Sequence, residues 1–158
     1  MILIIAEKPS LARNICAGIG EMKKQNGYYE GNGYLVSWAL GHLFQLYDVE
    51  DYTGEQNARW RLENLPYFPA EFKFKLRTKG REKQVDPGVA RQFEIIKALC
   101  NRGDVEKIVN AGDADREGEI IIRLCIQNAL TPPKPVGRRW RPDQTPQTVA
   151  KELLETQP

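Results

Sequence analysis

Hydrophobic runs with glycine or proline boundaries divide most of the chain into alternating strands and helices. Residues 2–6 form a continuous apolar run rich in β-branched side chains. Such a run is typical of a strand that is buried on both faces of a parallel sheet. Ser10 can cap a helix that continues to the glycines near residues 18–20. A strand followed directly by a helix is the opening of an α/β unit.

The same pattern recurs in the second half of the chain. Pro87 begins a segment with a 3.6-residue apolar period, and residues 107–110 form a second short apolar strand. Helical periodicity covers residues 116–130, residues 136–140 predict another strand, and Pro146 opens a last helix. This order predicts an α/β sandwich whose mainly parallel central sheet is flanked by helices.

The segment between the two halves follows different patterns. Residues 28–43 contain two strand-like pieces around Gly31-Asn32-Gly33, which is a hairpin-type turn signal. Residues 48–70 have no clean period and predict an irregular excursion. Phe72–Arg77 alternates between apolar and basic side chains, as a half-exposed strand does. We therefore expect a single domain over residues 1–158, with residues 44–85 as an insertion or antiparallel edge region.

The composition excludes several classes of protein but does not indicate a binding partner. The chain has 158 residues, 41% of them hydrophobic, and a formal net charge of +2. These values exclude a disordered tail or a collagen-like repeat, and they do not by themselves indicate nucleic acid. No apolar run approaches the ~20 residues that cross a bilayer, and no signal sequence follows residues 1–6. We expect a soluble cytosolic protein without a membrane partner, whose three cysteines are small core residues.

Acidic residues follow two of the predicted strands. Glu7 comes directly after the first strand, and Asp113 and Asp115 follow the strand at 107–110, with Glu117 two residues later. Because the carboxyl ends of parallel strands meet at one edge of a sheet, these side chains are expected on the same rim. Carboxylates that converge need a cation to offset their repulsion, and oxygen-only ligands fit Mg²⁺.

An alternative interpretation gives these acids structural roles. Asp115 could cap the following helix, and Glu117 could be an acid that favours the positive end of that helix. Glu7 has no capping role to explain it, which favours a metal site. Lys8 lies beside Glu7 and supplies the point charge that a phosphoryl-transfer centre needs, or else it forms an ordinary ion pair.

Three short motifs occur in order along the chain, and two further fragments accompany them. The motifs are residues 5–12 (IAEKPSLA), 37–43 (SWALGHL) and 112–118 (GDADREG), and the fragments are Ala58-Arg59-Trp60 and Asn64-Leu65-Pro66. Together they resemble the N-terminal Toprim domain of bacterial type IA topoisomerases of the topoisomerase III family. The resemblance covers residues 1 to at least 125. It implies a Toprim-type, Rossmann-like fold in a cytoplasmic, nucleoid-associated bacterial protein.

The resemblance also implies roles for individual residues. Glu7 matches the Toprim glutamate that binds metal and moves a proton at the 3′ oxygen of the broken strand. Asp113 and Asp115 match the metal-binding Asp-x-Asp pair, and Glu117 matches the acid that follows it. Lys8 matches a lysine that contacts the phosphate being cleaved. The implied cofactor is Mg²⁺, with Mn²⁺ as a substitute.

The implied substrate is single-stranded DNA. Trp60 and Arg59 look like DNA-contacting residues of the family, and Arg116 lies within the acidic motif. Trp60 could stack on a base, or it could be a core or interdomain aromatic residue. The nucleophilic tyrosine of the family lies in another domain, and none of the six tyrosines here has a matching context. We therefore expect the chain to be a Toprim fragment that works with the remaining topoisomerase domains.

Other basic and histidine positions carry weaker signals. Lys73, Lys75 and Arg77 could follow a phosphate backbone, although a solvated face is favoured for residues 73–83. A second cluster, Arg138, Arg139 and Arg141, could also follow phosphates. His42 is the only histidine, and we expect it to satisfy a buried hydrogen bond rather than to bind metal.

The sequence leaves two alternative functions open. One is another Toprim enzyme core, a nuclease or a primase, although the motif at 37–43 and Arg59-Trp60 favour the topoisomerase. The other is a non-catalytic α/β module that binds Mg²⁺ or DNA, such as a receiver domain. A receiver would need a Thr or Ser at the end of the next strand and a later Lys, whereas residues 136–140 are followed by Arg and Pro.

Because the nucleophile is expected outside the chain, the purified 158-residue protein should not relax supercoiled DNA with Mg²⁺ present. An agarose-gel relaxation assay measures this, with a complete type IA enzyme as the positive control. Relaxation by the chain alone would contradict the expectation.

Overall fold

The computed structural model describes residues 1–54, 67–80, 83–139, 143 and 145–155. Its main sheet has six strands in the order β10-β9-β1-β4-β3-β2. The strands are β1 (Ile2–Ala6), β2 (Lys23–Lys24), β3 (Tyr28–Gly31), β4 (Tyr34–Trp38), β9 (Lys107–Ala111) and β10 (Val136–Arg138). The pairs β10–β9, β9–β1 and β1–β4 are parallel, whereas β4–β3 and β3–β2 are antiparallel. The expected α/β class with a parallel centre and a hairpin edge is confirmed.

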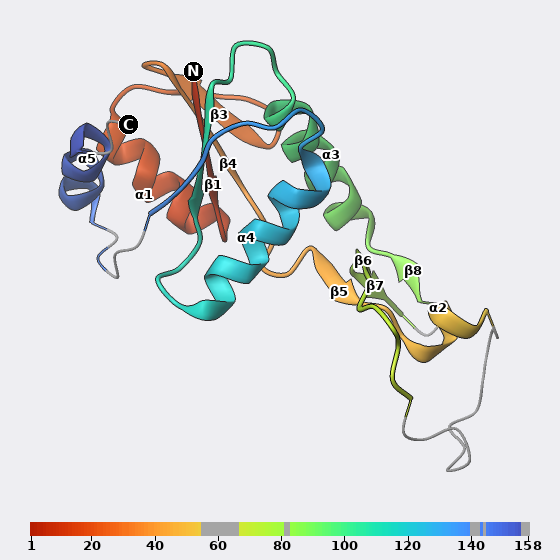
Figure 1. Cartoon of the computed structure of the whole chain (residues 1–158). Coiled ribbons are helices and arrows are strands. Elements are labelled where there is room, and N and C mark those ends of the chain that lie inside the picture. Colours follow the sequence, from red (N-terminus) through yellow and green to blue (C-terminus); the bar gives the residue numbers. More distant parts are fainter. Residues whose placement is uncertain (55–66, 81–82, 140–142, 144, 156–158) are drawn as a thin grey trace.

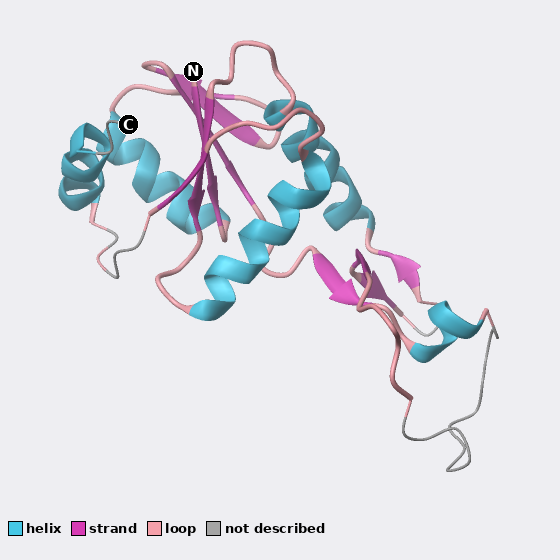
Figure 2. Cartoon of the chain, viewed as in Figure 1, coloured by secondary structure: helices cyan, strands magenta, loops and turns pink. Residues whose placement is uncertain are grey.

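Four helices cover the two faces of this sheet (Figures 1 and 2). On one face lie α1 (Pro9–Ile19) and α5 (Pro146–Glu155), and on the other lie α3 (Pro87–Cys100) and α4 (Arg116–Ala129). The strand β1 is central, and its alternate side chains enter the two cores. Leu3 and Ile5 pack with the α3 and α4 side, whereas Ile4 packs with the α1 side. All three are at most 1% exposed, as a strand buried on both faces requires.

The described residues between 44 and 85 lie outside the six-stranded sheet. They contain β5 (Phe44–Leu46), α2 (Val49–Thr53), β6 (Phe74–Leu76), β7 (Thr78–Lys79) and β8 (Gln84–Val85). Strand β5 pairs with β6, and β7 pairs with β8, each pair forming a separate two-stranded antiparallel sheet. Figure 1 shows the described elements of this lobe projecting from the sandwich beyond the N-terminal end of α3. The chain that precedes β5 and the chain that follows β8 connect the lobe to the sandwich.

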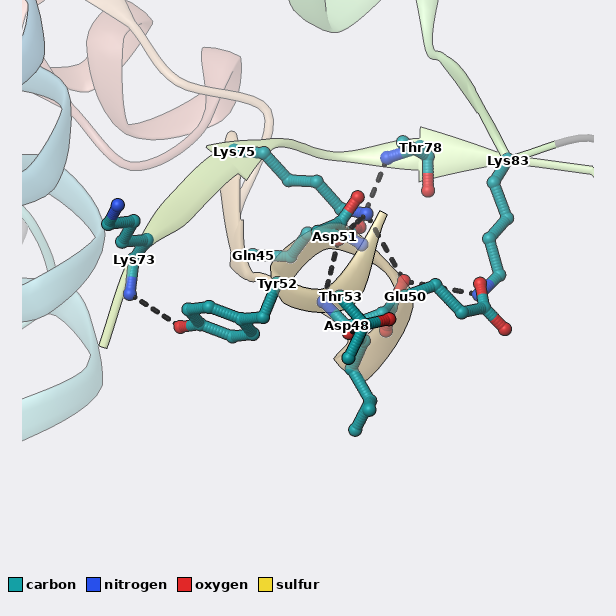
Figure 3. Close-up of polar contacts among 11 residues, drawn as sticks. Gln45, Asp48, Glu50, Asp51, Tyr52, Thr53, Lys73, Lys75, Thr78 and Lys83 are labelled. Carbon is teal, nitrogen blue, oxygen red and sulfur yellow. Dashed lines mark hydrogen bonds and ion pairs between the residues drawn. The ribbon is translucent and has the colours of Figure 1, made fainter. Parts of the chain in front are cut away.

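Ion pairs join acids at the start of α2 to Lys75 of β6 and to Lys83, which precedes β8 (Figure 3). Lys75 pairs with Asp51 and also lies 3.2 Å from Asp48, and Lys83 lies 3.3 Å from Asp48. The Lys75 side chain is only 19% exposed. The favoured expectation of a solvated basic face is therefore wrong at Lys75, because acids of the excursion neutralise it. Arg77 is also engaged and donates to the Leu40 carbonyl oxygen.

Several local expectations need correction. Ser10 does not cap α1, because Pro9 already occupies the first turn and Lys8 stands at the N-cap position. Residues 48–70 are not wholly irregular, since α2 begins there with a capping box between Asp48 and Asp51. The strand expected at 136–140 ends at Arg138, and residues 140–142 lie outside the described residues.

The three cysteines are buried free thiols, as expected of core residues. Burial raises the pKa of Cys100 to about 12 and that of Cys125 to about 12. Within the described part of the chain, no helix combines the length and apolarity needed to span a bilayer.

Two isoleucines of α4 that lie two positions apart, Ile120 and Ile122, test which face of this helix packs on the core. Ile122 is 0% exposed, whereas Ile120 is 51% exposed. Ile122→Ala should lower the free energy of unfolding by about 2–5 kcal/mol, because it leaves a cavity between α4 and the sheet. Ile120→Ala should change it by less than about 0.5 kcal/mol. Urea unfolding followed by circular dichroism measures both variants, and equal losses would contradict the assigned face.

Candidate active site

The carboxyl ends of β1 and β9 bring the candidate acids together. The two strands pair in parallel, with Ala6 opposite Ala111. Glu7 follows the first strand directly, and Asp113 lies two residues beyond the second. The backbone N–H of Asp113 donates to Glu7 Oε2 at 3.0 Å, across 106 positions of sequence. The strand pairing therefore produces this contact, which no local sequence pattern contains.

Lys8 lies on the same rim and pairs with an acid of the other strand. Its Nζ is 3.1 Å from Asp113 Oδ2, and its side chain is 47% exposed. The hydrogen bond with Asp113 raises the pKa of Lys8 above its ordinary value. Because the pair is only partly buried, its contribution to stability is small and the two side chains can separate at little cost.

Asp115 and Glu117 have partners of their own. Asp115 caps α4, and its Oδ1 accepts from Gly118 N at 2.6 Å. Glu117 Oε1 lies 2.8 Å from His42 Nε2, and both side chains are exposed. The capping role that the sequence left open for Asp115 is therefore present. The expectation that His42 satisfies a buried hydrogen bond is wrong, because its partner is an exposed carboxylate.

The loop that carries His42 is tied to the end of β1. Ala39 N donates to the Ala6 carbonyl oxygen, and Gly41 N donates to the Glu7 carbonyl oxygen. Gly41 has a φ of +68°, a left-handed conformation that glycine adopts without strain. The motif at residues 37–43 is thus hydrogen-bonded to the motif at residues 5–12, a contact that the sequence did not predict.

Two glycines allow the turn after β9 to pack directly on the first turn of α4. A Cβ on Gly118 would lie 2.3 Å from the Asp113 carbonyl oxygen, and one on Gly112 would lie 2.1 Å from the Gly118 carbonyl oxygen. Real side chains do not approach backbone atoms so closely. The conformation that presents Asp113 and Asp115 therefore depends on glycine at both positions.

The basic residues divide into exposed and buried groups. Arg116 lies in the first turn of α4 and is exposed. Arg139 is 9% exposed and pairs with Glu152, and Arg138 bonds the turn that carries Asp113. Both side chains have internal partners, so the structure gives no support to the possibility that these two residues follow a phosphate backbone. Arg59, Trp60 and Arg141 lie outside the described residues.

The rim fits a hard divalent cation in its donor chemistry, since all of its candidate ligands are carboxylates. Within the described ranges, however, no three acidic, histidine or cysteine side chains gather closely enough to hold a metal ion. Asp113 faces Lys8, Asp115 faces the Gly118 amide, and Glu117 faces His42.

Comparison with known proteins assigns the chain to a family. The Toprim domain family matches residues 2–141. This chain belongs to the Toprim domain family. Its relatives include three proteins named DNA topoisomerase 3, each compared over most of this chain. That of Shouchella clausii is 44% identical over 137 residues, 87% of this chain and 17% of the relative.

Two Bacillus proteins named DNA topoisomerase 3 extend the comparison. That of Bacillus subtilis (strain 168) is 41% identical over 138 residues, 87% of this chain and 18% of the relative. That of Bacillus thuringiensis (strain Al Hakam) is 37% identical over 156 residues, 99% of this chain and 20% of the relative. The Toprim chain therefore spans no more than a fifth of the length of these relatives.

The glycine contact in the Toprim turn gives a direct test. Gly118→Ala should destabilise the protein by about 1–3 kcal/mol or more, because the added Cβ collides with backbone that cannot move aside cheaply. Gly103→Ala is the control, since nothing lies within 4 Å of a Cβ there. Thermal unfolding measures both, and an unchanged midpoint for Gly118→Ala would contradict the described packing.

Proposed function

We propose that this Toprim domain is the Mg²⁺-binding module of a type IA DNA topoisomerase. In this proposal it supports cleavage and religation of single-stranded DNA by a tyrosine that lies outside these 158 residues. The observation that carries the proposal is the contact of Glu7 and Lys8 with Asp113 at the ends of two parallel strands. A carboxylate that handles a proton, a lysine for a phosphate and a metal-binding acid are the groups that this reaction needs.

Glu7, Asp113 and Asp115 are the proposed metal ligands, with Glu117 as a fourth carboxylate. Bound Mg²⁺ would stabilise negative charge on the phosphate and would keep several of its waters. To take part, Asp113 must exchange Lys8 for the ion, and Asp115 must use an oxygen beyond the one that caps α4. Neither change disturbs the strand pairing that brings the residues together.

The proposed chemistry conserves the number of phosphodiester bonds. In cleavage, the tyrosine hydroxyl loses its proton to solvent and its oxygen forms a bond to phosphorus, while the bond from phosphorus to the 3′ oxygen breaks; religation reverses both transfers. The leaving 3′ oxygen takes a proton, and Glu7 is the proposed donor; religation returns that proton to Glu7. Lys8, released from Asp113, is the proposed contact of the scissile phosphate.

The DNA strand would meet the rim through exposed basic and aromatic groups. Arg116 is solvent-exposed beside the acids, and we propose that it contacts the DNA backbone. Arg59 and Trp60 remain proposed DNA contacts on the resemblance alone. The tyrosine and the rest of the DNA path would come from further topoisomerase domains. Such an enzyme would work in the bacterial cytoplasm, where its DNA substrate lies.

The names of the relatives favour a topoisomerase over the other Toprim enzymes that the sequence left open. The proteins compared here are named DNA topoisomerase 3 rather than nuclease or primase. A purely structural DNA-binding module without a metal site is the remaining alternative, and metal binding separates it from the proposal.

The double variant Asp113→Asn/Asp115→Asn tests the metal site. Its Mn²⁺ affinity should fall at least about tenfold, because two anionic ligands are lost. Its affinity for single-stranded DNA should stay equal or rise, because negative charge near the phosphates is removed. Mn²⁺ electron paramagnetic resonance and fluorescence anisotropy measure the two affinities.

The matched control is Asp104→Asn/Glu106→Gln, an acid pair with the same spacing that precedes β9. It removes the same amount of charge away from the rim and should leave Mn²⁺ binding unchanged. Equal losses in both double variants, or a wild-type chain that takes up no Mn²⁺ at millimolar concentration, would contradict the proposed site.

A further inference from the structure

Arg138, the last residue of β10, reaches the turn that carries Asp113. Its Nη1 donates to the Gly112 carbonyl oxygen at 2.8 Å and to Asn110 Oδ1 at 3.1 Å. Its Nη2 donates to the Asp113 carbonyl oxygen at 2.6 Å. One planar guanidinium thus holds consecutive parts of the turn in a fixed geometry, which a flexible ammonium cannot reproduce.

A second set of contacts fixes Arg138 itself. Its Nε lies 2.7 Å from Glu119 Oε2, and the same oxygen accepts from Asn110 Nδ2 at 2.9 Å. Asn110 is 1% exposed, and the Arg138 side chain is 17% exposed. Buried charged and polar groups of this kind are retained only when they are paired, and their geometry is then well defined.

The network lies beneath the exposed rim and uses different atoms. Arg138 bonds the backbone carbonyls of Gly112 and Asp113, whereas the Asp113 carboxylate meets Lys8. Asn110 supports the same turn, because its Oδ1 accepts from Gly112 N at 3.0 Å. The orientation of the turn is therefore set from β10 and β9 without using the carboxylate of Asp113.

We infer that Arg138 is a positioning residue for the Toprim reaction, holding the turn at 112–113 so that the backbone N–H of Asp113 meets the Glu7 carboxylate. This inference rests on the proposed function, in which Asp113 is a metal ligand. Arg138 does not touch the reacting atoms in this account. It acts through the backbone of Asp113, the proposed metal ligand.

Arg139 provides a matched control on the neighbouring position. It is 9% exposed, and its Nε lies 2.6 Å from Glu152 Oε2. Its Nη2 donates to the Asp143 carbonyl oxygen at 2.6 Å. Both arginines are mostly shielded from solvent and ion-paired. Arg139 joins the end of β10 to α5, whereas Arg138 bonds the turn that carries Asp113.

The experiment compares Arg138→Gln, Arg138→Lys and Arg139→Gln in the whole chain. Hydrogen exchange resolved by NMR gives the protection of the Gly112, Asp113 and Asp115 amides, all of which are hydrogen-bonded. Arg138→Gln should speed their exchange at least about tenfold relative to amides in the centre of β1, which corresponds to about 1.4 kcal/mol. It should also weaken Mn²⁺ binding by about tenfold or more.

The other two variants separate positioning from general stability. Arg138→Lys should give intermediate values, since an ammonium keeps the charge but not the fork of donors. Arg139→Gln should lower the thermal midpoint and leave both readouts at the turn unchanged. If Arg138→Gln does not fold, the comparison of Arg138→Lys with Arg139→Gln decides the result.

Equal acceleration at all sheet amides, or the same behaviour in the Arg138 and Arg139 variants, would overturn the inference. A wild-type chain that binds no Mn²⁺ would contradict the proposed metal site instead. In that case the local exchange rates still decide whether Arg138 orders the turn.

Discussion

The parallel pairing of β1 with β9 is the contact on which the rest of the site depends. The two strands are in register from Ile2 opposite Lys107 to Ala6 opposite Ala111, so they end at the same level. Both are almost wholly buried, and a slip by one residue would move every apolar side chain to the opposite core. Hydrophobic burial therefore fixes the register, and the register brings Glu7 to the turn that carries Asp113.

The rim divides into an exposed layer of charges and a partly buried support. In the exposed layer, Lys8 faces Asp113 and His42 faces Glu117, through contacts that solvent weakens. In the support, Arg138, Asn110 and Glu119 are bonded to one another and to the turn. This division lets the carboxylates exchange partners when a cation or a phosphate arrives, while the backbone that carries them stays in place.

The central part of this arrangement could be predicted from the sequence, because its signals are local. The apolar runs at 2–6 and 107–110 define the strands, and the rule for carboxyl ends of parallel strands then brings Glu7 and Asp113 to one rim. The helix α2 was missed, although Asp48 and Asp51 have the spacing of a capping box before it.

Arg138 and His42 could not be assigned because their partners are distant in sequence. A run of arginines does not indicate burial, and the sequence does not reveal which backbone carbonyls a side chain will bond. The available signal was Asn110, a polar residue within a buried strand, which must have a hydrogen-bonding partner. For His42, the partner is Glu117, 75 positions away in the chain.

The most direct test of the central claim is an anomalous-difference map from crystals of this chain soaked in Mn²⁺. The account predicts a peak bounded by the carboxylates of Glu7, Asp113 and Asp115, with Lys8 turned away from Asp113. A well-ordered site without a peak, in which Lys8 still pairs with Asp113 at saturating Mn²⁺, would contradict the claim that this rim is a metal site.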